Sequence, residues 1–79
     1  MTNEEFVNLY RGRKVRILVD DTDLMSPRFK RGDIGIISDL VPGKYPIVVE
    51  LSIPRRDSNM EFKQDELKLL KVDPLPLPG

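Results

Sequence analysis

Apolar and polar residues alternate along most of this chain, and a period of two residues is typical of β-strands. In residues 14–20 the apolar side chains of Val15, Ile17 and Val19 would share one face of a strand. Comparable alternation or short apolar runs bounded by turn residues predict four further strands, at residues 34–40, 47–53, 60–63 and 67–72. We therefore expect a mostly β domain with five short strands.

The first eleven residues have a helical pattern instead. Thr2 and Glu5 have the spacing of a capping box, in which each side chain bonds a backbone amide at the start of a helix. Apolar residues then recur at i, i+3 and i+4, which predicts one apolar face formed by Phe6, Leu9 and Tyr10. Because a helix this short is marginal alone, we predict that residues 1–11 pack on the sheet, with binding of a partner as the alternative.

Residues 21–32 cannot continue the first strand, because they are largely polar and contain the strand breakers Pro27 and Gly32. A long loop is therefore expected after the first strand. Its large apolar residues are expected to fold back onto the core: Leu24, Met25 and Phe29. The strand alternation further predicts three residues inside that core: Ile17, Val49 and Phe62.

The run from Gly32 to Leu40, Gly-Asp-Ile-Gly-Ile-Ile-Ser-Asp-Leu, resembles the G-x-x-G-x-V-x-x-I signature of KOW-like and other SH3-like barrels. The resemblance implies that Gly32 serves the entry turn and that Gly35 lets a neighbouring strand approach closely. It also implies core positions for Ile37 and Leu40. The fold expected from it is a five-stranded SH3-like barrel over residues 12–72, with the helix at 1–11 before it and a flexible, proline-rich tail at 73–79.

Composition narrows the chemistry. The chain contains neither cysteine nor histidine, so it lacks the commonest zinc ligands and the commonest general base. Its serines lie outside any nucleophile motif, and the sequence has no glycine loop that would cradle phosphate. We predict that the protein is not an enzyme, with no catalytic residues, cofactor or metal.

The expected location follows from hydropathy. No segment reaches the roughly 20 apolar residues that a membrane-spanning helix needs, and the residues that follow Met1 are acidic where a signal peptide would be basic. We predict a cytoplasmic protein that does not engage membrane, and the absence of cysteine is compatible with this.

Any electrostatic function of this chain must come from local groups of charge, because thirteen basic residues balance thirteen acidic ones. Two basic groups stand out, Arg11–Arg16 and Arg28–Arg31, and they would merge if the long loop lay along the first strand. The resulting candidate surface for a partner or polyanion comprises Arg13, Arg16, Arg28, Lys30 and Arg31. The acidic run Asp20–Asp23 lies between the groups. It would be solvated, would pair with them, or would bind a divalent cation.

These observations favour a small, non-catalytic protein-interaction module. The resemblance to SH3-like barrels implies in addition an accessory protein of the kind common in bacteria and phages. The alternative is a KOW-like nucleic-acid-binding module that uses the two basic groups. Asp33 and Asp39 stand where such proteins often have a basic loop. A third option is a homo-oligomer that pairs exposed strand edges.

Overall fold

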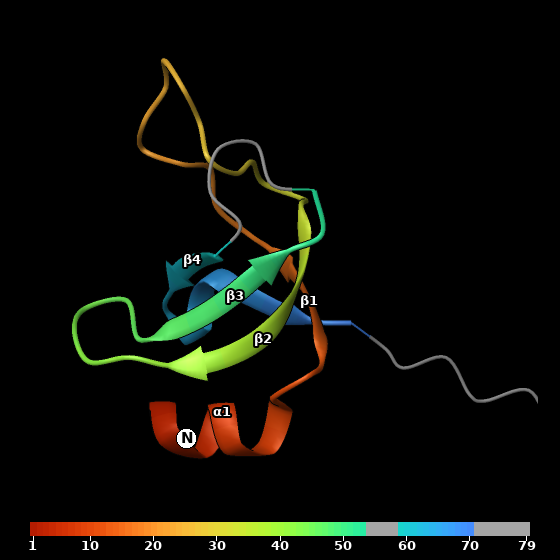
Figure 1. Ribbon diagram of the computed structural model, residues 1–79, viewed down its shortest axis with the longest axis vertical. Coiled ribbons are helices and arrows are strands. Elements are labelled where there is room, and N and C mark those ends of the chain that lie inside the picture. The colour runs from red at the N-terminus through yellow and green to blue at the C-terminus, as the bar shows by residue number, and fades with distance from the viewer. Residues whose placement is uncertain (54–58, 71–79) are drawn as a thin grey trace, which may run out of the picture.

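The computed structural model describes residues 1–53 and 59–70, and it is mostly β with one short N-terminal helix, as predicted (Figure 1). Along the chain the elements are α1 (Asn3–Tyr10), β1 (Lys14–Ile17), β2 (Ile34–Leu40), β3 (Ile47–Leu51), β4 (Asn59–Phe62), a 3-10 turn (Gln64–Glu66) and β5 (Leu67–Leu69). Figure 1 shows α1 and the long loop between β1 and β2 at opposite ends of the molecule. The predicted tail at 73–79 lies outside the described residues.

The five strands form one antiparallel sheet in the order β4-β3-β2-β1-β5. This sheet is open, because its edge strands β4 and β5 do not pair with each other in the part of the chain that the structure describes. Closing a barrel requires its two edge strands to pair, and here they are only four and three residues long. The five strands are confirmed, and closure into an SH3-like barrel stays a prediction.

The core lies on one face of the sheet and obeys the predicted alternation. Ile17 and Val49 are 0% exposed and Phe62 is 1% exposed, so the three predicted core residues are confirmed. Ile37 is also fully buried, and Leu40 is a partly buried residue packed against the core. The strand phase was therefore readable from the sequence, although several strands end earlier than predicted.

The helix begins with the predicted capping box. The Glu5 amide donates to Thr2 Oγ1 at 3.0 Å, and the Thr2 amide donates to Glu5 Oε1 at 3.2 Å. Its buried face differs from the prediction, because Val7 is buried and Leu9 is 63% exposed. At 3.6 residues per turn Tyr10 projects between Phe6 and Val7, whereas Leu9 points about 100° away from Tyr10.

Gly35 is needed where β2 and β3 approach closely. A Cβ atom at this position would lie 2.5 Å from Val49 Cγ1 and 2.7 Å from the carbonyl oxygen of Glu50. Since that carbonyl belongs to the paired strand, neither strand can move without disturbing the ladder. The close approach expected from the resemblance is confirmed, as is the entry turn at Gly32, whose φ is +95°.

Replacing Gly35 with alanine is expected to lower the free energy of unfolding by about 1–3 kcal/mol, because the added methyl overpacks a closed interface. Urea denaturation would measure the change. Glu50→Ala, an exposed position on the next strand, is the control and should alter stability by less than about 0.5 kcal/mol. Equal stability of Gly35→Ala and the parent chain would contradict the contact geometry.

Candidate functional site

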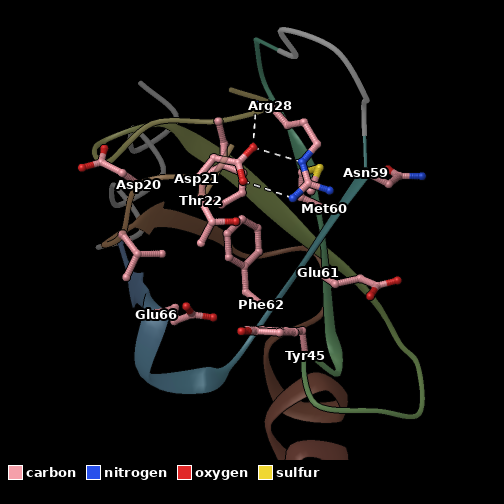
Figure 2. Close-up of a pocket in the computed structure, with 12 residues that line it drawn as sticks. Asp20, Asp21, Thr22, Arg28, Tyr45, Asn59, Met60, Glu61, Phe62 and Glu66 are labelled. Atoms are coloured by element: carbon pink, nitrogen blue, oxygen red, sulfur yellow. Dashed lines mark hydrogen bonds and ion pairs between the residues drawn. The ribbon is translucent and has the colours of Figure 1, made fainter. Parts of the chain in front are cut away.

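The long loop between β1 and β2 is fastened at its base by a buried carboxylate. Asp21 is 4% exposed, and its two oxygens accept hydrogen bonds from four donors of the loop. Figure 2 shows the bonds from Arg28. The Arg28 side chain provides two of them, with Nε 3.0 Å from Oδ2 and Nη2 3.1 Å from Oδ1. The Arg28 amide donates to Oδ2 at 2.8 Å and the Asp23 amide donates to Oδ1 at 3.3 Å. Both ends of residues 22–27 are thereby tied together.

Asp21 is ionised at neutral pH despite its burial. The Arg28 side-chain hydrogen bonds hold the pKa of this carboxyl well below its ordinary value, and they outweigh the opposing effect of desolvation. Pairing within the loop was one of the sequence-based alternatives for the acidic run, and it is confirmed for Asp21. Solvation of that residue is wrong, because a carboxylate with this many internal donors replaces its water shell.

A second attachment joins the loop to the sheet through two aromatic rings. Phe29 is 7% exposed and meets Phe62 of β4 edge to face, with ring centroids 4.9 Å apart and planes at 66°. Such pairs add about 0.5–1.5 kcal/mol beyond their buried area. The predicted burial of Phe29 is confirmed. The loop is therefore held by a polar contact at Asp21 and by an apolar contact at Phe29.

Leu24 and Met25 do not fold back onto the core. They are 84% and 95% exposed. The Asp21–Arg28 pair closes residues 22–27 into a loop, and the tip of that loop, which contains Leu24 and Met25, points outward. Asp23 Oδ1 accepts from the Ser26 amide at 3.1 Å, which shapes the turn at that tip. The sequence-based prediction for these two residues is therefore wrong.

A groove lies between the base of this loop and β4 (Figure 2). Its volume is about 330 Å³, and it is lined by all four residues of β4 together with Val19–Thr22, Arg28, Phe29, Tyr45 and Glu66. The floor is apolar, since Met60 and Phe62 point inward with exposures of 6% and 1%. Sequence reasoning did not find this groove, because the residues that line it come from five separate segments of the chain.

The groove lining is predominantly acidic. Asp20, Asp21, Glu61 and Glu66 contribute carboxylates, and Arg28 contributes the one guanidinium among the described lining residues. Because Asp21 and Arg28 neutralise each other at 3.0 Å, the lining keeps an excess of three carboxylates, those of Asp20, Glu61 and Glu66. The groove therefore favours cationic groups.

Tyr45 lines the groove and is 41% exposed. Its ring already attracts two cations, with the ammonium groups of Lys63 and Lys44 at 5.4 Å and 5.8 Å from the centroid. Ammonium groups within about 6 Å of an aromatic face are held by the ring quadrupole. These two ammonium groups partly offset the carboxylates at the Tyr45 end of the groove, so the acidic character is concentrated at Asp20, Glu61 and Glu66.

Two of the five predicted basic residues are committed to internal contacts. Arg28 holds Asp21, and Arg13 donates from Nη2 to the carbonyl oxygen of Leu70 at 3.0 Å while its guanidinium lies 5.8 Å from the Tyr10 ring centroid. Both side chains are half-buried. The guanidinium groups of Arg13 and Arg28 are therefore already engaged within the protein.

The other three predicted residues, Arg16, Lys30 and Arg31, are exposed. The end of the loop does run beside the first strand, since the Gly32 amide donates to the carbonyl oxygen of Ile17 at 2.8 Å. Acidic groups accompany it: the Arg31 amide donates to Asp20 and the Lys30 amide donates to Asp33. The role of Arg16, Lys30 and Arg31 as a surface for a partner or polyanion stays a prediction.

A sequence signal for the loop base was present. Asp21, Asp23 and Arg28 flank the turn-forming Ser26-Pro27 pair, and an aspartate that bonds the amide two residues later is a common turn device. The signal does not specify that Asp21 is the buried carboxylate rather than Asp20 or Asp23, because that depends on the sheet beneath the loop.

Comparisons of the chain with protein-family models, curated proteins and solved structures find no match. Within residues 1–53 and 59–70, no helix has the length and apolar character that crossing a membrane would require.

Proposed function

We propose that this protein is a non-catalytic protein-interaction module that binds its partner in the groove between β4 and the long loop. The observation that carries the proposal is the buried Asp21–Arg28 pair, which fixes one wall of the groove before any partner arrives. A preorganised wall reduces the ordering cost of binding. An apolar floor with polar groups at its margin is the usual composition of a recognition site.

The sheet supports this proposal as a scaffold. Five antiparallel strands with one long loop after the first strand are compatible with an SH3-like barrel, a fold that hosts many unrelated binding functions. The fold does not by itself identify the binding surface. That surface is identified by the groove, which residues of β4 and of the long loop line.

A tryptophan placed in the groove is expected to prevent partner capture without unfolding the protein. Thr22 and Asn59 line the groove and are exposed, so Thr22→Trp and Asn59→Trp would fill it from opposite walls. Full-length protein immobilised as bait in host lysate should retain a defined protein partner, insensitive to nuclease. Both variants should lower that retention at least tenfold.

Asn8→Trp is the matched control, because Asn8 is exposed on α1 and does not line the groove. It should retain the partner like the parent chain, and all three variants should keep the parent melting temperature to within a few degrees. Partner retention that survives both groove variants would overturn the proposed site.

Nucleic acid is the competing ligand, and Arg16 is the residue that favours it, because it is exposed on β1 directly opposite Lys68 of β5. A labelled oligonucleotide titrated with salt distinguishes the two functions. Phosphate contacts give a log-log slope of about −0.7 to −0.9 per contact. Under our proposal binding is weak at low salt, vanishes near physiological salt, and changes little in Arg16→Glu/Lys68→Glu.

A further inference from the structure

We propose that the groove accepts an extended segment of a partner protein, which pairs with the free edge of β4 as a sixth strand and brings a basic side chain to the acidic rim. This inference rests on the proposed function and specifies the shape and charge of the ligand. Two independent features lead to it, the position of β4 in the sheet and the residues that line the groove.

The first feature is the strand edge. Among the described strands β4 pairs with β3 alone, so its other edge belongs to the boundary of the sheet. In an antiparallel strand the N–H and C=O groups of one residue point to the same side, and those of the next residue point to the opposite side. Half of the backbone groups of β4 therefore point away from β3, and such an edge is a template for another strand.

The second feature is that the groove runs along this edge. Successive strand residues point to opposite faces of a sheet, so Met60 and Phe62 project into the core, and Asn59 and Glu61 project outward. All four nevertheless line the same groove. A groove in contact with both faces of a strand follows the edge between them, where a pairing segment would lie.

The opposite wall limits the ligand to a single chain segment. Residues Val19–Thr22 and Arg28–Phe29 lie across the groove from β4, and the Asp21 and Phe29 contacts hold them there. Edge pairing with a folded second copy would bring that copy's own helix and strands against this wall. An extended polypeptide needs only the width of one strand, about 4.8 Å from β4.

Charge and apolarity specify the ligand further. Alternate side chains of an added strand would point inward, toward Met60 and Phe62, and outward, toward Glu61. The excess of carboxylates in the lining favours arginine or lysine in the outward positions, whereas the apolar floor favours aliphatic side chains inward. The expected ligand is an extended peptide that alternates basic and aliphatic residues.

Backbone N-methylation tests the pairing directly. A random octapeptide display library would be selected on the full-length protein, and the strongest binder would be synthesised in three forms. These are the parent peptide, one methylated on the amides of odd residues, and one methylated on those of even residues. Only one set of amides faces β4 in a strand pair, so one isomer should lose at least tenfold in affinity and the other less than threefold.

Two protein variants test the charge. Glu61→Lys should weaken binding of the parent peptide at least tenfold, and Glu50→Lys is the matched control because Glu50 is exposed on β3, one strand away from the groove. Amide hydrogen exchange should slow at β4 when the peptide is bound. Equal losses from both methylated peptides, or exchange protection confined to the loop tip, would overturn strand pairing.

Other outcomes separate this inference from the proposed function. Selection of peptides rich in acidic residues, or selection of no peptide at all, contradicts the ligand class described above. If Thr22→Trp and Asn59→Trp still prevent partner capture in that case, the groove remains the binding site and only the extended-segment model fails. If capture is also unaffected by those variants, both proposals fail.

Discussion

Phe62→Ala is expected to leave the protein only about 0–2 kcal/mol of stability at 25 °C. Phe62 is 1% exposed, and it connects the sheet to the loop through its ring contact with Phe29 at 4.9 Å. Truncating a buried phenylalanine costs about 3–5 kcal/mol, since the lost transfer energy adds to the cavity left behind. A domain of this size has a total stability near the lower end of the usual range, about 5 kcal/mol.

Thermal and urea denaturation would measure this change. Phe62→Leu should remain folded with a smaller loss, because it retains most of the apolar volume. Leu24→Ala serves as the control, since Leu24 is 84% exposed and its truncation removes no core contact. A Phe62→Ala protein as stable as the parent chain would show that β4 does not present this face to the core.

Asp21→Asn is expected to lower the free energy of unfolding by about 2–4 kcal/mol. Removing one partner from a buried ion pair costs about 3–5 kcal/mol, and the lower figure allows for the 33% exposure of the Arg28 side chain. The asparagine keeps the size of the side chain but cannot accept all four donors. Asp20→Asn is the matched control, because Asp20 is an exposed neighbour, and it should cost less than about 1 kcal/mol.

Lowering the pH should remove the difference in unfolding free energy between the parent chain and Asp21→Asn. The pKa of Asp21 is lowered in the folded protein from an ordinary value of 3.8, so its contribution is fully present above the unfolded-state pKa and is lost as the pH falls toward the folded-state pKa. The stability gap between the parent chain and Asp21→Asn should be constant from pH 7 to about pH 5 and should narrow steadily below about pH 4. A gap that does not change between pH 6 and pH 3 would show that the carboxylate charge is not responsible.

The sheet was predictable because its information is local. The alternation around Ile17, Val49 and Phe62 fixes which face of each strand is buried, and Gly35 marks the close approach of two strands. The capping box of Thr2 and Glu5 is equally local. Such patterns need no knowledge of the rest of the molecule.

The loop and the groove were less predictable, because they depend on contacts between distant segments. Apolarity predicted that Leu24 and Met25 would be buried, but the ion pair between Asp21 and Arg28 sends them outward. Charge counting placed Arg28 on an open basic surface, although its guanidinium is needed inside the loop. Closure of the barrel also depends on long-range strand pairing, which alternation alone does not determine.

The tie between Asp21 and Arg28 has a consequence for how this protein can change. Residues 24–27 do not line the groove and add no buried apolar residue to the core. Because the entropy cost of a loop grows slowly, by about 0.6 kcal/mol for each doubling of its length, this segment is an insertion site. Grafted sequences of different length at 24–27 should leave the groove intact, so the tip of the loop can diversify independently of the fold that carries it.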